Sequence, residues 1–325
     1  QQVSTEQAVR VHTPWRAERR VSTMAPELSG IIPNAPTTVT ALLIVALTAL
    51  LLIYRRRHPY LSRQYAKFRV ISKRTVSQNA ERPVVFIAFG VSTASLPTGQ
   101  HVQVRAVIDG EEVERPYTPA RFEPPECELL LRVYPDGKMS RYLYSLDVGD
   151  YAELRGPIGH IRYGDGGPGT FSRGSKRKFT GVTHVAMLAG GTGITPMLQL
   201  CNHVLQTLPA RSDPTQLRLV EANSCVADIM MHDELRAIAS NSSEQLHLTF
   251  TVSKLSAKER KDSTLRHLVN ASLRDANAYG DVLRDAFDGC PADERTMVCL
   301  CGPKGFVTAA KAIVTEIGYT QILVW

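Results

Sequence analysis

The order of two hydrophobic patterns along the chain is the strongest constraint on its fold. Between residues 68 and 163, apolar runs of strand length, such as VVFIAFGV and HVQVRAVI, are separated by turn residues. This pattern predicts an antiparallel β-barrel or sandwich. Beyond Gly181, strand-like runs alternate with helix-like runs, as in THVAMLA followed by PMLQLCNHVLQTL. We therefore expect a β + α/β chain, in which an antiparallel β-barrel domain precedes a doubly wound domain with a mostly parallel sheet.

An uncharged apolar run near the N-terminus predicts a membrane anchor. Residues 37–54 read TTVTALLIVALTALLLIY, and three arginines follow directly. A transmembrane helix needs about 20 apolar residues, with a lower limit of about 17. The alternative is a cleaved signal peptide, which usually has a shorter apolar region followed by small residues rather than arginines. The predicted segments are a flexible tail (1–36), the transmembrane anchor (37–54), a basic juxtamembrane linker (55–67), the β-barrel domain (68–172), an interdomain connector (173–182) and the α/β domain (183–325).

Positive charge is concentrated beside this apolar run. The net charge is +7, and residues 55–74 contain eight Lys or Arg and no Asp or Glu, whereas residues 75–325 are slightly acidic. Because basic flanks stay on the cytosolic side of a membrane, we expect a single pass with a cytosolic body. The same distribution removes the main argument for nucleic-acid binding, which would place a basic surface on the folded body.

The six cysteines form no CxxC motif, no zinc-site spacing and no iron–sulfur pattern. We therefore expect reduced thiols and no metal site.

A glycine cluster follows the first strand of the predicted α/β domain. Residues 190–193 read GGTG, and Thr195 and Pro196 precede a run with helical apolar spacing. Glycines permit a tight turn, Thr195 is a candidate N-cap, and amides at a helix start can bind a phosphate. The spacing is not GxGxxG, so a turn without a ligand remains the alternative. Loops at Asn223 and Cys301 follow later strands and are expected at the same sheet edge.

The predicted β domain contains two further candidate binding motifs. In RPYTP, Arg115 can clamp a pyrophosphate, Tyr117 can face a planar ring, and Thr118 can bond a ring nitrogen, a set that suits a flavin nucleotide. The alternative is a plain turn between strands. Residues 137–140, GKMS, place a glycine turn before a short predicted helix, which is a second candidate anion site.

Five motifs, RPYTP, GKMS, RGPIG, LAGGTGITPM and CGP, occur in an order that resembles the NADH-cytochrome b5 reductase family, over residues 68–325. The resemblance implies an FAD-binding barrel, an NADH-binding α/β domain, and FAD and NADH as cofactors. It implies catalytic roles for Thr118 near the flavin N5, Thr195 at the flavin side and Cys301 beside the nicotinamide. The implied cofactor-binding residues are Arg115, Pro116, Tyr117, Thr118, Arg132, Tyr134, Gly137, Lys138, Met139, Ser140, Gly190, Gly191, Thr192, Gly193, Thr195, Pro196, Asn223, Asp228, Cys301, Gly302 and Pro303.

Asp228 stands where this family carries an acid. A carboxylate near the ribose 2′-hydroxyl accepts its hydrogen bond and repels a 2′-phosphate, so the resemblance implies a preference for NADH over NADPH. The alternative role for such an Asp is a helix cap. The chain departs from the family at Arg132, where a lysine is usual, in residues 254–294, and at Trp325, where phenylalanine is usual.

The resemblance also implies the reaction. NADH would pass a hydride to FAD, and the flavin would release single electrons to cytochrome b5 or a b5-like haem protein. One alternative is a flavin reductase for a quinone or another haem protein. Another is a membrane-tethered binding protein that has lost turnover.

A basic surface is expected to meet the acceptor, because b5-like domains are typically acidic around the haem edge. The alternative is a solvated loop without a partner. The candidate residues are Arg155, Arg162, Arg173, Lys176, Arg177 and Lys178. The family offers the endoplasmic reticulum and the mitochondrial outer membrane, and we expect the former because the tail contains three glutamates, unlike an acid-poor transit peptide.

Overall fold

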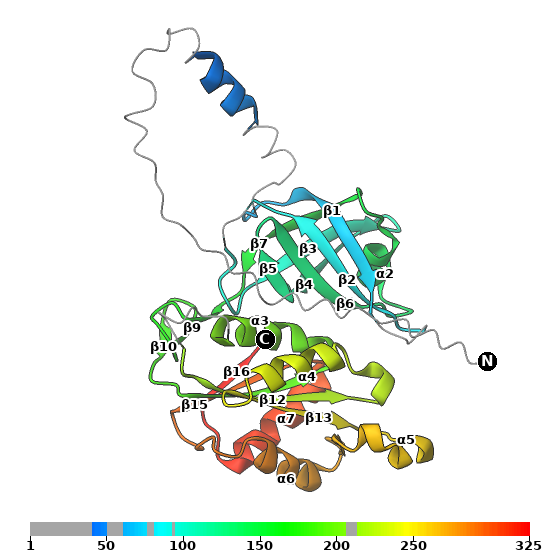
Figure 1. The fold of residues 1–325 in the computed structure, drawn as a ribbon, viewed down its shortest axis with the longest axis vertical. Coiled ribbons are helices and arrows are strands. Elements are labelled where there is room, and N and C mark those ends of the chain that lie inside the picture. Colours follow the sequence, from blue (N-terminus) through cyan, green and yellow to red (C-terminus); the bar gives the residue numbers. More distant parts are fainter. Residues whose placement is uncertain (1–40, 51–60, 77–80, 93–94, 206–212) are drawn as a thin grey trace, which may run out of the picture. The chain divides into compact units, whose positions relative to one another are not determined.

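The computed structural model describes residues 41–50, 61–76, 81–92, 95–205 and 213–325. The chain separates into two units, Gln1–Leu51 and Leu52–Trp325. In the first unit, residues 41–50 form a helix with exposed side chains, drawn in blue in Figure 1. Within the described ranges, every helix is too short or too polar to span a bilayer. The predicted anchor, residues 37–54, extends on both sides into residues outside these ranges. The predicted tail and part of the basic linker also lie outside them.

The second unit begins with an antiparallel sheet. This sheet and the elements that follow it up to β10 are here called the β domain. Its seven strands lie in the order β4-β3-β7-β1-β2-β6-β5 (Figure 1). Buried and more exposed side chains alternate along β3 and β7, as expected when one sheet face covers a core. In the described residues the outer strands β4 and β5 do not pair with each other, so the sheet is antiparallel as predicted but open. The strands are β1 (Ala66–Thr75), β2 (Val84–Gly90), β3 (His101–Ile108), β4 (Glu111–Tyr117), β5 (Arg121–Glu123), β6 (Glu126–Arg132) and β7 (Tyr151–Ile158).

The core of this sheet is closed by one short helix, α2 (Lys138–Ser145). Met139 and Leu143 of α2 belong to the same buried cluster as Phe68 of β1 and Leu129 of β6. The helix start is therefore fixed against the sheet by apolar packing, which also places the GKMS amides at the edge of the core.

A three-stranded sheet follows the seven-stranded sheet and overlaps the region where a connector was expected. Its strands, in the order β10-β9-β8, are β8 (Ile161–Tyr163), β9 (Phe171–Arg173) and β10 (Arg177–Phe179). The region predicted as an interdomain connector, residues 173–182, thus contains the end of β9, the turn and strand β10 of a β-hairpin.

The C-terminal part, here called the α/β domain, is built on a parallel sheet with the strand order β14-β13-β12-β11-β15-β16. Every strand pair within it is parallel. Its strands are β11 (His184–Gly190), β12 (Gln216–Asn223), β13 (Leu246–Val252), β14 (Leu268–Asn270), β15 (Thr296–Cys301) and β16 (Ile322–Val324). Its helices are α3 (Ile194–Leu205), α4 (His232–Asn241), α5 (Ala257–Lys261), α6 (Ala276–Ala286) and α7 (Lys304–Ile317).

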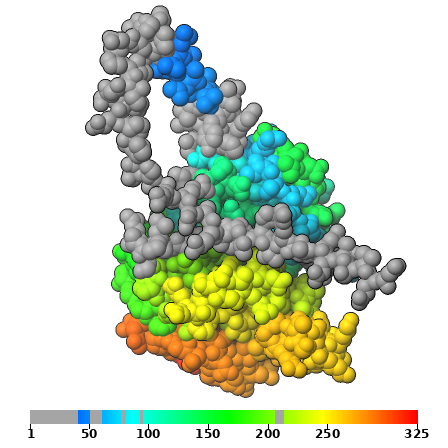
Figure 2. Space-filling model, viewed as in Figure 1, coloured from blue at the N-terminus to red at the C-terminus, as the bar shows by residue number. Residues whose placement is uncertain are grey.

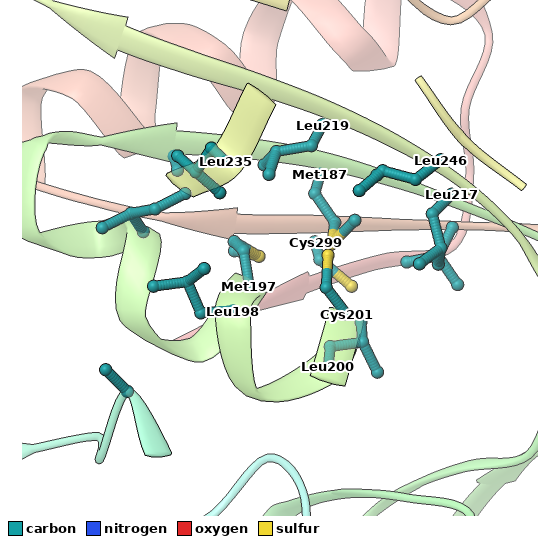
Figure 3. Close-up of a cluster of buried hydrophobic side chains, with 14 of the residues drawn as sticks. Met187, Met197, Leu198, Leu200, Cys201, Leu217, Leu219, Leu235, Leu246 and Cys299 are labelled. Atoms are coloured by element: carbon teal, nitrogen blue, oxygen red, sulfur yellow. The ribbon is translucent and has the colours of Figure 1, made fainter. Parts of the chain in front are cut away.

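Alternate residues of the central strand β11 enter two different cores. Met187 belongs to a buried cluster with Met197 of α3 and Leu235 of α4, and Figure 3 shows these side chains gathered beside the sheet. Leu188 belongs to a second cluster with residues of α6 and α7, including Leu283. Helices therefore cover both faces, and the prediction of a doubly wound sheet is confirmed.

Residues 254–294, which depart from the family pattern, form regular elements here. They include α5, β14 and α6, which contribute to the continuous yellow-to-orange surface of the α/β domain in Figure 2. The α5 start has a capping box, because Ser256 accepts from the Glu259 amide while the Glu259 carboxylate accepts from Ser256. At the start of α6, the Asp275 side chain caps the helix by accepting from the amide of Ala278.

Candidate functional site

A cavity of about 820 Å³ lies between the β domain and the α/β domain. Because the carboxyl ends of parallel strands are the usual ligand-binding edge of such sheets, its position at the ends of β11 and β15 agrees with the sequence prediction. Most of the predicted site residues line it. These are Arg115, Pro116, Tyr117, Thr118, Arg132, Tyr134, Gly137, Lys138, Met139, Ser140, Thr192, Gly193, Thr195, Pro196, Cys301 and Gly302.

Strand β4 carries the RPYT residues to the cavity wall. The β3–β4 register sets Tyr117 opposite Val102 and Arg115 opposite Val104. Burial raises the pKa of Tyr117 to about 12, so its hydroxyl stays protonated. The Arg115 guanidinium donates to the carbonyl of its neighbour Glu114 at 2.8 Å, and Arg115 lines the cavity. A polar ring and a cationic fork thus stand on one wall.

The second motif of the β domain forms the start of α2. Gly137 is the N-cap and has no side chain to cap the helix, so the first amides remain available to a ligand. Ser140 holds the turn in shape, because its hydroxyl donates to the Gly137 carbonyl at 3.1 Å and accepts from the Tyr134 amide at 3.2 Å. A Cβ at Gly137 would lie 2.4 Å from the Ser140 hydroxyl oxygen. A side chain at Gly137 would therefore displace the Ser140 hydroxyl that holds this cradle.

The glycine turn of the α/β domain is a short 3-10 segment, Gly191–Gly193, between β11 and α3. Gly191 has a φ of +56°. A Cβ at Gly193 would lie 2.2 Å from the carbonyl oxygen of Cys301, because the loop after β15 packs directly against the turn. The glycines thus bring two loop segments together at the strand ends, and this close approach sets one wall of the cavity.

Thr195 is not the N-cap that the sequence predicted. The helix α3 begins at Ile194, and the Thr195 hydroxyl donates within the turn to the Thr192 carbonyl at 3.2 Å. The reason is that the 3-10 segment runs into the α-helix without an extended capping residue between them. Thr195 nevertheless lines the cavity, as predicted from the resemblance.

The three expected catalytic residues line this one cavity. They come from the end of β4 (Thr118), the first turn of α3 (Thr195) and the end of β15 (Cys301). Burial raises the pKa of the Cys301 thiol to about 11. At neutral pH all three therefore present uncharged groups, which suits ring contact rather than acid–base or thiolate chemistry.

Arg132 and Asp228 form a buried ion pair that crosses from one domain to the other. Their side chains are 7% and 3% exposed, with Arg132 Nη1 3.9 Å from Asp228 Oδ1. Arg132 Nη2 also donates to the backbone carbonyl of Asp228. A second arginine, Arg82, lies 3.3 Å from the same carboxylate and is 38% exposed. Two arginines of the β domain therefore neutralise this acid.

Asp228 is thus engaged in a contact that the sequence did not predict. It does not line the cavity, and its predicted contact with a ribose stays a prediction. The alternative role as a helix cap is wrong, because α4 begins at His232 and its N-cap is Met231.

Glu221 is a fully buried carboxyl that sequence reasoning missed. Its Oε1 accepts from Asn223 Nδ2 at 3.0 Å and from the Met230 amide at 3.2 Å, so it closes the base of the loop that carries Asp228. Burial raises the pKa of Glu221 to about 7. A single acid inside a run of apolar strand residues, LRLVEAN, was the available signal.

Five predicted binding residues lie outside the cavity lining: Gly190, Gly191, Asn223, Asp228 and Pro303. Gly190 instead makes room for Phe306, whose ring atoms would lie 2.9 Å from a Cβ at that position. The cavity includes further residues that were not predicted: Gly99, His101, Leu130, Leu131, Asp136, Gly159, His160, Ile161, Arg173, Val324 and Trp325. The RGPIG motif could have indicated Gly159, but nothing local marks most of the others.

The charge of the cavity suits dinucleotides. Arg115, Arg132, Lys138 and Arg173 line it, with Asp136 as the acidic side chain among the lining residues. Arg132 and Lys138 are paired with Asp228 and Glu111, so Arg115 and Arg173, together with the glycine cradle at Gly137, are the groups that favour the pyrophosphates of FAD and NADH. The residues present therefore fit both cofactors.

Comparisons with known proteins agree with this geometry. Two family models match, an oxidoreductase FAD-binding domain over residues 67–163 and an oxidoreductase NAD-binding domain over residues 187–312. Human NADH-cytochrome b5 reductase 2 is 31% identical over 294 residues, which cover 83% of this chain and 98% of the relative. Human NADH-cytochrome b5 reductase 1 is 34% identical over 269 residues, which cover 78% of this chain and 82% of the relative. The cytochrome b5 reductase domain of Ulva prolifera nitrate reductase matches with a TM-score of 0.67 at 28% identity, covering 82% of this chain and 100% of that domain.

Proposed function

The chain belongs to the NADH-cytochrome b5 reductase family and is an FAD-dependent, NADH-oxidising reductase, and from this premise we propose that it passes electrons to cytochrome b5 or a b5-like haem protein from a membrane-anchored position. The observation that carries the proposal is the single cavity between the domains, to which all five sequence motifs or their immediate neighbours contribute.

The β domain supplies the residues that would hold FAD. Arg115 offers its guanidinium and the start of α2 offers backbone amides to the pyrophosphate, whereas the Lys138 ammonium is paired with Glu111 at 2.5 Å. Tyr117 and Thr118 present a ring and a hydroxyl beside them. On the α/β side, Thr195 would contact the flavin and Cys301 the nicotinamide half of NADH.

Bound FAD would supply the redox chemistry, taking a hydride from NADH and giving up its two electrons one at a time. The chain's own residues bind and orient. Thr118 provides a neutral hydrogen-bonding group, Cys301 keeps its proton, and Arg132 holds a fixed positive charge at the cavity wall. Since Asp228 compensates that charge, Arg132 can stay buried without a ligand.

A basic surface on the β9–β10 hairpin supports docking of an acidic haem protein. Arg173, Lys176, Arg177 and Lys178 are exposed there, and Arg173 also lines the cavity. The other two candidates already have partners among the described acids, Arg155 with Glu114 at 3.5 Å and Arg162 with Asp165 at 3.4 Å. We therefore assign the docking surface to the hairpin.

Salt dependence tests the acceptor. Electrostatic steering raises association rates by about 10- to 1,000-fold at low salt and fades as the Debye length shrinks from about 10 Å at 0.1 M to about 3 Å at 1 M. Reduction of cytochrome b5 should slow steeply with salt, while reduction of ferricyanide, which needs no docking, changes less. Changing Lys176, Arg177 and Lys178 together to Glu should reproduce the loss at low salt. Insensitivity to both treatments would refute this acceptor surface and favour a quinone or another haem protein.

The membrane anchor is supported by the composition of residues 37–54 and the basic residues that follow. We propose a single pass with the body in the cytosol, in the endoplasmic reticulum. Full-length protein should remain in the pellet after carbonate extraction, and protease added outside intact microsomes should digest the body. Release of the chain into the supernatant would refute the anchor, whereas protection of the body would refute the orientation.

A further inference from the structure

Helix α3 carries a polar stripe along an otherwise apolar helix. Gln199, Asn202 and His203 are spaced three and four residues apart, which places them on one face. The remaining faces are buried in an apolar cluster of the α/β domain that also includes β-domain residues such as Phe86 and Tyr163. The α3 residues in this cluster include Met197, Leu198, Leu200, Cys201 and Val204. The stripe needs polar partners outside that core, and it finds them in the β domain.

Two of the stripe residues bind the loop that precedes β3. Gln199 Oε1 accepts from the Gly99 amide at 2.6 Å, and Gln199 Nε2 donates to the Gln100 carbonyl at 3.2 Å. Beside them, the Thr98 hydroxyl and His203 Nδ1 are 2.9 Å apart. The side-chain amide of Gln199 thus bonds the backbone of two consecutive residues across the domain boundary, the amide of Gly99 and the carbonyl of Gln100.

Trp325 binds the same loop from another direction. Its indole Nε1 donates to the Gly99 carbonyl at 3.0 Å, so both backbone groups of Gly99 are held by the α/β domain. The Trp325 amide donates to the Leu300 carbonyl at 3.0 Å, which ties this residue to β15. Gly99 cannot be replaced easily, because its φ is +96° and a Cβ would lie 2.7 Å from the Ile161 carbonyl oxygen.

The third stripe residue binds a second segment of the β domain. Asn202 Nδ2 donates to the carbonyl of Ala120 at 3.2 Å, two residues after Thr118 in the chain. The stripe therefore contacts the β domain beside both Gly99 and Thr118, which line the cavity. The first turn of the same helix carries Thr195, which also lines the cavity.

We propose that Gln199 and Trp325 are positioning residues, which hold the two walls of the cavity at the separation that hydride transfer from NADH to FAD requires. Helix α3 is the rigid link, since its first turn lies at the cavity and its polar stripe is fixed to the backbone of the β domain. The loss of about 1 Å of alignment can cost about 100-fold in rate, so a few hydrogen bonds at this seam have leverage on the reaction. The proposal rests on the FAD and NADH assignment and is independent of the electron acceptor.

The test compares two glutamine substitutions in the full-length protein. Gln199→Met removes the bonds to Gly99 and Gln100 with little change in volume. The control, Gln245→Met, likewise removes two hydrogen bonds from a side-chain amide to the backbone, here donated by Gln245 Nε2 to the carbonyls of Asp213 and Thr215 at 2.5 and 3.0 Å. It is matched in chemistry but does not line the cavity or contact the Gly99 loop.

Two readouts separate positioning from simple destabilisation. In Gln199→Met, flavin content should match the parent, flavin bleaching by NADH in a single turnover should slow about tenfold or more, and hydrogen exchange at the Gly99 amide should accelerate about tenfold or more. Gln245→Met should stay within about twofold of the parent in both rates. Trp325→Phe keeps an aromatic ring but loses the indole donor, and it should slow bleaching in the same direction.

Parent-like bleaching in Gln199→Met would overturn the proposal, as would unchanged exchange at Gly99 or an equal loss of rate in the Gln245 control. None of these results would bear on the acceptor, because the bleaching assay contains no haem protein. Conversely, cytochrome b5 that is not reduced by an enzyme with normal bleaching would refute the proposed acceptor and leave the positioning roles intact.

Discussion

Replacing Asp228 by Asn tests the buried ion pair that joins the two domains. The substitution keeps the shape of the side chain and removes its charge. Arg132, 7% exposed, would then lack its carboxylate partner, while Arg82, 38% exposed, would turn to water. The variant therefore isolates the cost of leaving one guanidinium buried without a counter-charge.

The magnitude follows from these contacts. Removing one partner of a buried ion pair typically costs about 3–5 kcal/mol. We expect the lower end, about 3 kcal/mol, because Arg132 Nη2 keeps its hydrogen bond to the backbone carbonyl of Asp228 and the direct pair is 3.9 Å apart. In domains of about 150–250 residues each kcal/mol lowers the melting temperature by about 2–4 °C, so in this longer chain the midpoint should fall by no more than about 6–12 °C.

Urea unfolding of the FAD-loaded protein, followed by flavin and far-ultraviolet signals, measures the change. Asp293→Asn is the matched control, because Asp293 pairs with Arg295 at 2.7 Å on the surface and should have little effect. Equal stability of the parent and Asp228→Asn would refute the buried-pair reasoning. Steady-state rates with both nucleotides on the same variants test the predicted ribose contact, since a parent that uses NADPH as efficiently as NADH would exclude it.

Three further changes test other parts of the site. Arg115→Ala should purify with less flavin, because each charge-assisted bond to the pyrophosphate is worth about 1.5–3 kcal/mol, and a variant as yellow as the parent would contradict the assignment. Gly193→Ala should destabilise the protein and impair NADH oxidation, since its Cβ would meet the Cys301 carbonyl oxygen at 2.2 Å. Gly305→Ala is the control, because Gly305 lies in a helix with open space around it, and this variant should be neutral or slightly stabilising in thermal unfolding. Burial raises the pKa of Glu221 from its ordinary value of 4.5 to about 7, so stability should fall by about 3 kcal/mol as pH rises between these values. Glu221→Gln should flatten that slope in urea unfolding at pH 5 and pH 8, and an unchanged slope would show that another group is responsible.

Much of the fold was predictable because its signals are local. Period-two alternation in β3 and β7 reflects one buried sheet face, and the uniformly apolar VAMLA run of β11 reflects a strand covered on both faces. The open edge between β4 and β5 was not predictable, because closure depends on how the whole sheet curls. The regular elements in residues 254–294 were also missed, since family motifs are absent there although ordinary caps such as Ser256 are present.

By itself the sequence determined which short segments would carry binding groups: RPYTP, GKMS and the glycine turn each need particular residue types for backbone geometry or charge. The tertiary structure alone decided which distant groups these segments would meet. The carboxylate of Asp228 pairs with Arg82 and Arg132, and the indole of Trp325 reaches Gly99, across separations of up to 226 residues. The physical reason is that such contacts arise from strand register and from the packing of two independently patterned domains, and a local pattern of residues contains neither.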